Sequence, residues 1–511
     1  MKINNTFTQG LQGIDHRLLH PQQIPNASYA YVAPKKLDNP RHVHTNHSLV
    51  DQLGLTNVKN LDAILTGQEN FEGFIPFSMN YAGHQFGHWA GQLGDGRAII
   101  IGELSHNDKS YQLQLKGAGL TPFSRSGDGN AVLRSTIREY LCSEAMYHLG
   151  IPTTRSLSMH KTGELVMRDI MYNGNAAHEQ GALMCRVSSS FIRFGNFQLH
   201  AARKEYDHLR ALMDFTIEHH YSHLSKDIEG YIALFKEIVE RTMHTVMQWQ
   251  RVGFVHGVMN TDNMSILGET IDYGPYGWID AYDRDWTPNT TDLKERRYRF
   301  GNQPNIAMWN LVQLANAFMP IIQDQKSLED VINKQYVSFT GAYISMMYSK
   351  LGIFENNKDD NFIYNLEQLL HTQEIDMTLF FRNMSKIDVP DDHSYIQFVS
   401  YLKQAIYSES EEIIEIQKWK NWFSAYRQII KKEDNSQEDR SLKMNTINPS
   451  FTLRNYITYE AIEKAEKGDY TLFQELFDQL QHPYIDKNPW FKKAPKWAKT
   501  KVGCSMLSCS S

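Results

Sequence analysis

The sequence contains little cysteine, with four residues in 511. So few thiols exclude a disulfide scaffold and indicate a reducing compartment, for which we expect the cytoplasm. Cys142 and Cys185 stand in apolar surroundings and are predicted to be buried thiols. Cys504 and Cys509 lie near the C-terminal end.

Long apolar runs and long basic runs are also missing. No stretch approaches the ~20 apolar residues that a membrane-spanning helix needs, so we expect no membrane segment. Residues 1–12 have no apolar core behind a basic start, which argues against a secretory signal. The net charge of −6 gives no support for nucleic-acid binding. With 41% hydrophobic and 12% aromatic residues, the composition is that of a globular protein.

The hydrophobic pattern changes near residue 200. Before it, alternating and aromatic runs predict strands within 76–125 and 154–168, around one helix at 131–149. Asp95-Gly96 lies between two strand-like runs and predicts a hairpin. Residues 431–441 are charged and predict an exposed linker. After residue 200, apolar residues recur at helical spacing in 207–219, 228–251, 305–318, 327–351, 361–373, 394–409, 413–431, 456–467 and 471–481.

The chain is organised around residues 253–272, GFVHGVMNTDNMSILGETID. A polar loop, a short apolar strand and a turn predict a hairpin with Asn263 and Asp272 at its two ends. Amide and carboxylate oxygens are ligands that Mg²⁺ accepts, so these two residues can hold one divalent ion. Gly, Asn and Asp also build ordinary turns, and this stretch alone leaves both interpretations open.

The same stretch has the shape of the protein-kinase pattern, in which Asn follows His by seven positions and an Asp precedes Gly. His256, Asn263 and Asp272 match it. The usual base, two positions after the His, is replaced by Val258, which cannot accept a proton. Asp262 stands beside the predicted metal ligand instead.

A Gly-rich segment, a strand lysine and a helix glutamate precede this motif in the order of a kinase fold. Gly94, Gly96 and Arg97 can bring backbone N–H groups and a charge to a phosphate. Lys116, at a strand end, can reach a phosphate, and Glu139 on the next helix can pair with it. Each feature alone is more often a turn or a solvated side chain. The Gly-rich segment, the lysine, the glutamate, the asparagine and the aspartate follow one another in the order of a kinase fold, and this order favours a nucleotide site.

Two arginines extend the predicted anion site. Arg186 and Arg193 are seven positions apart, which on a helix places both on one face as an anion clamp. Asp128-Gly129, in the loop before the predicted helix, can cover the ligand, although a plain turn is the simpler interpretation.

These patterns predict an α+β, protein-kinase-like two-lobed fold with a small β-rich N-lobe, a helical C-lobe and an additional helical C-terminal elaboration. We expect a wrapping extension at 1–75, the N-lobe at 76–185 and the C-lobe with the metal hairpin at 186–350. A helical elaboration at 351–490 and an extended, flexible Cys-containing tail at 491–511 follow.

Several runs closely resemble the SelO family, also called YdiU-like. They are YAGHQFG (81–87), QLGDGR (92–97), LKGAG-TPFSR (115–125), HGVMNTDNMS (256–265) and NP-F-LRN (448–455). The resemblance covers nearly the whole chain. It implies a kinase-like fold that transfers AMP from ATP, rather than phosphate, to Ser, Thr or Tyr hydroxyls of other proteins. UMP transfer with Mn²⁺ is also attributed to the family.

The resemblance also implies roles by position, with ATP reversed so that its terminal phosphates are buried. Asp262 would accept the proton, and Asn263 and Asp272 would hold Mg²⁺ or Mn²⁺. The nucleotide contacts would be Gly94, Gly96, Arg97, Lys116 positioned by Glu139, Asp128, Gly129, Arg186, Arg193 and Asp272.

In some relatives a tail cysteine pairs with a cysteine in the loop after the metal aspartate. Residues 282–289 contain no cysteine here, so this redox switch is not expected. Cys504 and Cys509 can pair with each other or stay free.

Two other functions remain. A small-molecule kinase of the aminoglycoside-kinase type shares the His-Gly loop, but Val258 argues against it. A non-catalytic ATP-binding scaffold would not need Lys116, Asn263 and Asp272 together.

Overall fold

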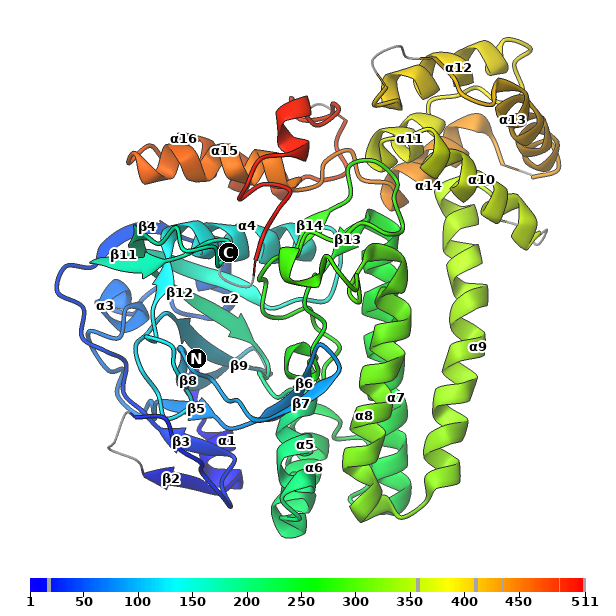
Figure 1. Cartoon of the computed structure of the whole chain (residues 1–511). Helices are drawn as coiled ribbons and strands as arrows, with labels where there is room; N and C mark the ends of the chain where they lie inside the picture. The colour runs from blue at the N-terminus through cyan, green and yellow to red at the C-terminus, as the bar shows by residue number, and fades with distance from the viewer. Residues whose placement is uncertain (16–19, 355–358, 409–411, 434, 487, 509–511) are drawn as a thin grey trace.

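The computed structural model describes the chain except for residues 16–19, 355–358, 409–411, 434, 487 and 509–511. Within these limits it is a mixed α+β protein, as predicted, with one ten-stranded sheet and many helices. The sheet lies on one side in Figure 1, and the long helices of residues 194–350 stand beside it. The limits of the two predicted lobes remain predictions.

The large sheet follows the order β2-β3-β5-β8-β9-β12-β11-β4, with β1 paired to β8 and β10 paired to β12. All of its pairs are antiparallel except β2 with β3. Its members are β1 (Lys2–Ile3), β2 (Gly13–Asp15), β3 (Tyr29–Tyr31), β4 (Arg41–Thr45), β5 (Phe77–Met79), β8 (Ala98–His106), β9 (Lys109–Lys116), β10 (Ala131–Val132), β11 (Arg155–Arg168) and β12 (Ala177–Ser188).

The segment predicted as a wrapping extension contributes four strands, β1 to β4, to this sheet. Besides these strands it contains the helix α2 (His47–Gln52). Two shorter helices, α1 (Thr6–Gly10) and α3 (Leu61–Leu65), complete it. The N-terminal segment is therefore part of the sheet layer.

The strand β9 differs from its prediction. The alternation of Leu113 and Leu115 with Gln112 and Gln114 predicts a half-buried strand with the glutamines on its solvated face, yet both glutamines are buried. Helix α4 (Leu133–His148) packs against β11 and β12, and the loops of the second half cover the site end of the sheet. A polar face between such layers must find its hydrogen-bond partners inside the protein.

The predicted hairpin at Asp95-Gly96 is wrong. The strand before it, β7 (His88–Gln92), pairs with β6 (Ala82–Gln85) as a separate two-stranded sheet, whereas β8 after it pairs with β9. Residues 93–97 therefore connect two sheets and do not close a hairpin.

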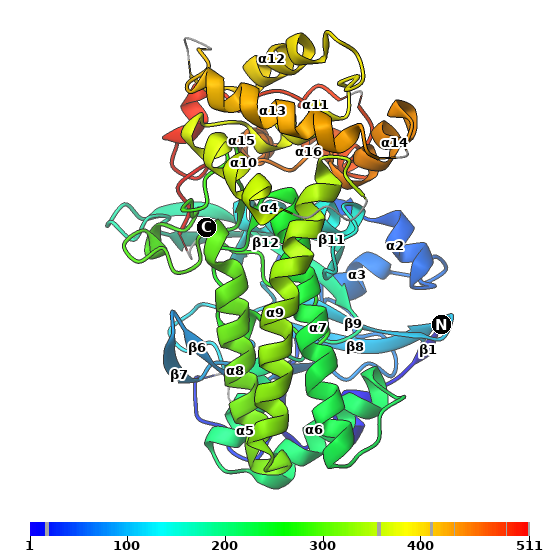
Figure 2. The same ribbon diagram turned by 90° about the vertical axis from the view of Figure 1, so that its right-hand side faces the viewer.

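The predicted helices after residue 200 are confirmed, with shifts of a few residues at their ends. They are α6 (Tyr206–His220), α7 (Ile228–Val252), α8 (Gln303–Ile322), α9 (Gln325–Lys350), α10 (Asp360–Thr372), α12 (Ser394–Ala405), α13 (Ile416–Ile430), α15 (Asn455–Glu466) and α16 (Thr471–Leu480). Helices α7, α8 and α9 stand side by side in Figure 2, and α7 packs against both of the others.

Three helices in the part of the chain after residue 190 were not predicted. They are α5 (Phe194–Ala202), α11 (Met377–Met384) and α14 (Gln437–Ile447). Helix α14 begins inside the predicted linker at 431–441, which is therefore wrong in its second half. Its Arg440 is buried, and the guanidinium donates to the Tyr426 hydroxyl and the Ile387 carbonyl at 2.8 and 2.7 Å. These hydrogen bonds offset the cost of burying the charge.

The described part of the C-terminal tail, residues 491–508, is packed and not extended as predicted. A 3₁₀-helix covers Lys496–Lys499, and Cys504 is only 1% exposed. The Leu507 N–H donates to the Pro288 carbonyl at 3.0 Å, and the Thr290 N–H donates to the Leu507 carbonyl at 2.7 Å. Cys142, Cys185 and Cys504 are buried free thiols, which confirms the prediction for the first two. Cys509 lies outside the described residues.

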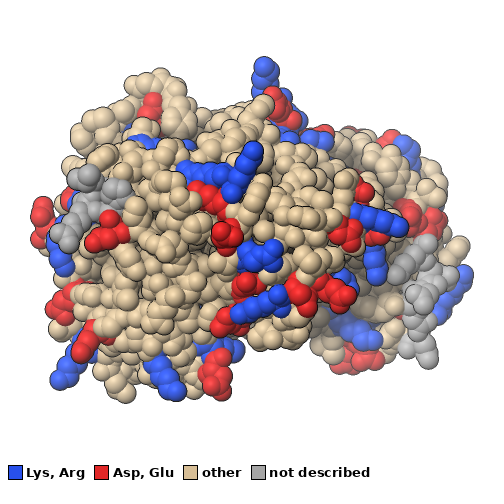
Figure 3. Space-filling view, turned by 90° about the horizontal axis from the view of Figure 1, so that it is seen from below, with Lys and Arg blue, Asp and Glu red and all other residues tan. Residues whose placement is uncertain are grey.

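Charged side chains of both signs are interspersed on the face shown in Figure 3, which gives no sign of a continuous basic surface there. No helix in the described part of the chain is long and apolar enough to cross a membrane.

A buried ion pair fixes the C-terminal helices to each other. Asp376, the N-cap of α11, accepts from Arg454, the N-cap of α15, with Arg454 Nη2 2.8 Å from Asp376 Oδ1. Both residues are buried, and Asp280 lies 3.3 Å from the same guanidinium. Removing one partner of such a pair leaves an uncompensated buried charge.

We therefore expect Arg454→Met to lower the free energy of unfolding by about 3–5 kcal/mol, because Asp376 loses its cation. Urea unfolding followed by circular dichroism measures it. Lys418→Met removes the exposed pair with Glu415 and is expected to change stability by about 0.5 kcal/mol or less. Equal effects of the two changes would contradict the role assigned to the buried pair.

Candidate nucleotide site

The predicted site residues gather around one cavity of about 810 Å³ between the sheet and residues 258–275. Sequence positions almost 180 apart meet there. The lining includes Gly94, Gly96, Arg97, Lys116, Asp128, Gly129, Arg186, Arg193, Asp262, Asn263 and Asp272. The structure thus brings together every residue predicted to contact the nucleotide or the metal.

Lys116 lies at the end of β9, where the strand reaches the cavity. Its Nζ is 2.5 Å from Glu139 Oε2 and 3.6 Å from Asp272 Oδ1. Glu139 projects from α4 and is buried, so the predicted lysine–glutamate contact is present. Burial lowers the pKa of Lys116, and the Glu139 carboxylate opposes this by stabilising the ammonium.

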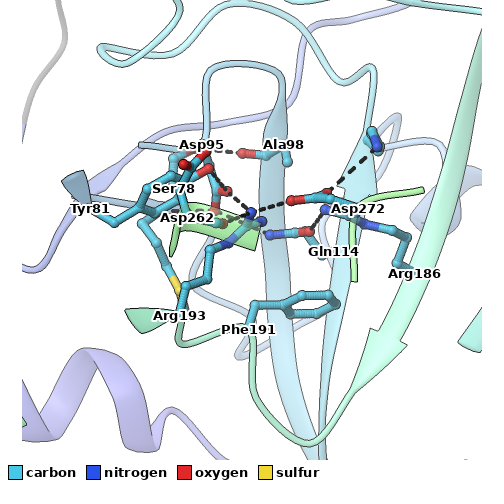
Figure 4. A network of polar contacts seen from close by, with 12 residues as sticks. Ser78, Tyr81, Asp95, Ala98, Gln114, Arg186, Phe191, Arg193, Asp262 and Asp272 are labelled. Atoms are coloured by element: carbon cyan, nitrogen blue, oxygen red, sulfur yellow. Dashed lines mark hydrogen bonds and ion pairs between the residues drawn. The ribbon is translucent and has the colours of Figure 1, made fainter. Parts of the chain in front are cut away.

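The two arginines do not lie on a helix, contrary to the prediction. Arg186 is in β12, and Arg193 is the N-cap of α5, with the end of the strand, a bend and irregular backbone between them. They nevertheless converge, because the chain turns after β12 toward the loop that carries Asp272. Figure 4 shows both guanidinium groups directed at Asp272.

Asp272 is the centre of the charge network. Arg186 Nη1 lies 2.6 Å from its Oδ1, and Arg193 Nη1 donates to its Oδ2. Burial alone would raise the pKa of Asp272, but the guanidinium groups of Arg193 and Arg186 hold it well below its usual range. The residue has a left-handed backbone with φ of 56°, which turns the carboxylate toward the arginines.

Asp262 has the opposite environment. It lies in a 3₁₀-helix, Thr261–Asn263, is 7% exposed, and its Oδ1 has no hydrogen-bond partner among the described residues. Its Oδ2 accepts from Gln85 Nε2 at 3.3 Å. Burial raises the pKa of the Asp262 carboxyl to about 6. A buried carboxylate with a free oxygen beside a cavity can accept a proton from a bound group.

A glycine makes room for this carboxylate. A Cβ placed on Gly83 would lie 2.7 Å from Asp262 Oδ1, closer than any side chain tolerates. The β6 strand can therefore approach the loop only without a side chain at this position.

Asn263 and Asp272 both border the cavity, as the metal hypothesis requires. The Asn263 amide donates from Nδ2 to the Val258 carbonyl at 3.0 Å, which leaves its oxygen for a ligand. His256 contacts the Ile271 carbonyl at 2.9 Å and joins the two ends of the loop. The hairpin strand predicted at 264–267 is reduced to isolated bridges, Met264 with Thr270 and Ser265 with Arg193. An amide oxygen and a carboxylate suit Mg²⁺ or Mn²⁺.

Sequence reasoning missed several polar partners of the arginines. Asp95, 2% exposed, lies 3.5 Å from Arg193 Nη2 and accepts from Gln114 Nε2 at 3.2 Å. The Tyr81 hydroxyl donates to Asp95 Oδ1 at 3.2 Å, and Arg193 lies over the Tyr81 ring. The signal for Gln114 was its place on the polar face of the strand that ends in Lys116.

The rim of the cavity is more exposed than its interior. Arg97 is exposed. Asp128 accepts a bidentate pair of hydrogen bonds from Arg168, with Nη1 2.7 Å from Oδ2 and Nη2 2.9 Å from Oδ1. The Arg168 guanidinium is part of the reason that the pKa of Asp128 is lowered, although burial acts in the opposite direction. The cations at the inner end are Lys116, Arg186 and Arg193, and Glu139, Asp272 and Asp95 are their carboxylate partners. The inner end of the cavity therefore concentrates charges of both signs in ion pairs.

Three bacterial relatives match this chain from end to end. Each bears the name Protein nucleotidyltransferase YdiU, from Flavobacterium johnsoniae, Cytophaga hutchinsonii and Rhodopirellula baltica, at 49%, 45% and 44% identity. Each comparison covers 100% of this chain and 99% of the relative. Together with the site, they define the class of this protein as an enzyme of the nucleotidyltransferase type.

The family described as Protein adenylyltransferase SelO matches residues 19–481. The match spans most of the 511 residues, and the chain belongs to the SelO family. The resemblance seen in the sequence is thereby confirmed.

The contrast between the two aspartates predicts opposite effects on stability. At pH 8 without nucleotide or metal, Asp262→Asn is expected to raise the free energy of unfolding by about 1–3 kcal/mol, because it removes a desolvated charge. Asp272→Asn is expected to lower it by about 3–5 kcal/mol, because Arg186 and Arg193 lose their carboxylate.

The pH dependence of the first effect has a definite sign. Because the pKa of Asp262 is raised to about 6 in the folded protein, its ionised form destabilises the fold at high pH. The gain from Asp262→Asn should therefore fade as pH drops from about 6 toward 4. Urea unfolding at pH 5 and pH 8 measures it, and a gain that is equal or larger at pH 5 would contradict the assignment.

Proposed function

We propose that this enzyme transfers AMP from ATP to Ser, Thr or Tyr hydroxyls of other proteins, in a two-lobed, kinase-like arrangement of the sheet and the helices. The observation that carries the proposal is that three ion-paired cations, Lys116, Arg186 and Arg193, line the same cavity as Asp262, a carboxylate with an oxygen that has no hydrogen-bond partner among the described residues. The cations suit the phosphates of a nucleotide, and the carboxylate suits the proton of an acceptor hydroxyl.

The distribution of charge supports a reversed nucleotide. The β- and γ-phosphates carry most of the charge of ATP, and Lys116, Arg186 and Arg193 are the least exposed cations that line the cavity. Terminal phosphates bound there would leave the α-phosphate nearer the opening. The Gly-rich connection with Gly94, Gly96 and exposed Arg97, and the loop with Asp128 and Gly129, would then contact the rest of the nucleotide.

Asp262 is assigned the role of proton acceptor. The acceptor oxygen attacks the α-phosphorus, its proton moves to the free Oδ1 of Asp262, and the bond from the α-phosphorus to the bridging oxygen breaks. Pyrophosphate leaves with the electron pair of that bond. Gln85 holds the other carboxylate oxygen and so fixes the orientation of Asp262.

Asn263 and Asp272 are assigned to a divalent metal, Mg²⁺ or Mn²⁺. When bound, such an ion neutralises phosphate charge and orients the phosphates. Arg186 and Arg193 already neutralise Asp272, and phosphate oxygens offer them alternative acceptors of the same kind. Glu139 keeps Lys116 oriented toward the cavity. UTP in place of ATP would use the same phosphate contacts.

A small-molecule kinase of the aminoglycoside-kinase type is the other candidate. It requires a proton acceptor at the place of Val258, whose side chain is apolar and buried. The carboxylate of Asp262, four positions later, has the free oxygen instead. This arrangement favours nucleotidyl transfer.

The position of a radioactive label tests the proposal. With Mg²⁺ and protein acceptors from a cell extract, we expect covalent label from α-labelled ATP and none from γ-labelled ATP. Asp272→Ala should abolish the labelling. Asp262→Asn should slow it by about 10²–10⁴-fold, because the proton acceptor is lost, while ATP affinity changes little.

Asp392→Asn is the matched control, since Asp392 is fully exposed and distant from the cavity, and its labelling should equal that of the wild type. Protein label from the γ position would establish phosphate transfer and overturn the assignments of Arg186, Arg193 and Asp262. If ATP binds but neither position gives protein label, the result would favour a non-catalytic ATP-binding scaffold.

The close approach of Gly83 generates a second prediction. Gly83→Ala is expected to lower the labelling rate by about 10–100-fold, because the added methyl group displaces Asp262 by a fraction of an ångström or more. Calorimetry should show ATP affinity close to that of the wild type. Gly341→Ala, whose Cβ meets nothing within 4 Å, is the control and should retain full activity. Full activity of Gly83→Ala would contradict the assigned role of Asp262.

A further inference from the structure

We propose that His42, Asp62 and His160 form a second metal site, for Zn²⁺ or a similar transition-metal ion, that is separate from the nucleotide cavity. None of the three residues lines that cavity. They come from β4, α3 and β11, and one ligand atom from each lies within 4.8 Å of the other two. The proposal does not depend on the proposed function.

Strand pairing brings the two histidines together. His42 and His160 are direct partners in the antiparallel register of β4 and β11, next to an irregularity between Met159 and His160. Directly opposed residues project to the same face of a sheet, with Cβ atoms about 4.5–5.5 Å apart. Their rings lie 5.4 Å apart. Asp62, in the first turn of α3, places a carboxylate next to this pair of histidines.

His160 is the observation that points to a ligand. It is 2% exposed, and neither of its ring nitrogens has a hydrogen-bond partner in the described part of the chain. Buried polar groups are nearly always satisfied, so an imidazole without a partner requires an explanation. Its Nε2 lies 3.4 Å from Asp62 Oδ1, an ion-pair distance that is too long or poorly aligned for a hydrogen bond.

The same distance suits a shared metal ion. Zn²⁺ bonds of about 2.0–2.2 Å to nitrogen and oxygen place two ligand atoms roughly 3.4 Å apart in a tetrahedron. His42 and Asp62 are exposed, so modest rotations of their side chains can complete the set. The Thr45 hydroxyl lies 2.9 Å from His42 Nε2 and restrains that ring.

The ligand set selects the kind of ion. Two imidazoles and one carboxylate are a Zn²⁺ set with a fourth position for water, whereas Mg²⁺ and Ca²⁺ prefer oxygen ligands throughout. The 64% exposed side chain of Asp62 gives the ion a route from solvent. A bound ion would tie α3 and β4 of the N-terminal segment to β11, so its role would be structural.

The test is calorimetric titration of the full-length protein with Zn²⁺ alone, after removal of metals with a chelator. Excess Mg²⁺ in the buffer occupies the oxygen-ligand site at Asn263 and Asp272. We expect the wild type to bind one equivalent of Zn²⁺, and His42→Gln and Asp62→Asn each to weaken this binding by about 10–100-fold or more. Both changes are at exposed positions, so folding should be unaffected.

His47→Gln is the matched control, because His47 is an exposed histidine near β4 that belongs to no such cluster among the described residues. Its Zn²⁺ affinity should equal that of the wild type. Equal Zn²⁺ affinity in wild type, His42→Gln and Asp62→Asn would overturn the proposal, as would the absence of Zn²⁺ binding under Mg²⁺. In that case His160 and Asp62 are neighbours that share no ion.

Hydrogen exchange provides a readout that surface binding would not move. Zn²⁺ should slow exchange in residues 41–45 and 61–65 of the wild type by several-fold, because it links them to β11. Asp62→Asn should abolish this protection, and protection that persists in Asp62→Asn would overturn the proposal. Co²⁺ in place of Zn²⁺ should give the visible bands of a tetrahedral site in the wild type and lose them in His42→Gln.

Discussion

The contact of Asp272 with Arg186 and Arg193 is the interaction on which the site depends. Moving a guanidinium group out of water costs several kcal/mol, and both arginines are almost completely buried. Asp272 and Glu139 offset this cost by accepting their hydrogen bonds. Because Arg186 belongs to β12, Arg193 to the start of α5 and Asp272 to the loop after Ile271, one carboxylate joins the sheet to the helical half.

This contact also preorganises the chemistry. The buried cations have fixed directions before a nucleotide enters, so little reorganisation is needed when phosphate oxygens arrive. Asp272 cannot serve a metal ion and both arginines without a change in its contacts, however. In the proposed function, binding of nucleotide with metal would therefore exchange partners among charges that are already buried, and the contacts of the resting protein would set its energetic cost.

The sequence predicted the elements whose signals are local. The long helices α7 and α9 were found because apolar residues recur at helical spacing, and site residues were found because their runs match a family. The errors arose where partners distant in sequence decide the structure. Arg186 and Arg193 have a spacing that suits a helix, yet pairing of β12 with β9 imposes extended backbone at Arg186. Asp95-Gly96 has the residues of a hairpin turn, yet its flanking strands pair elsewhere.

The sequence also did not predict the roles of residues that act through tertiary contacts. The sequence shows Asp95 as a turn residue and Gln114 as a solvated strand residue, and only the packed sheet turns both toward the arginines. The prediction of a linker in a charged segment was wrong for the same reason, because buried contacts far away in the sequence decide its structure. Residues 437–441 look like a linker, but Arg440 finds enough buried acceptors to hold α14 against the protein.

Two of the buried polar groups that have atoms without a hydrogen-bond partner among the described residues lie beside other potential ligand groups. Asp262 and His160 both lie at the border of the packed core, and each has a ring or carboxylate atom without a hydrogen bond among the described residues. Leaving a buried polar atom unpaired costs about 1–3 kcal/mol, so such atoms persist where another group completes them. For Asp262 the proposed function makes an acceptor hydroxyl that enters the cavity the completing group. For His160 the neighbours are a second histidine and a carboxylate, which makes a metal ion the group of matching chemistry.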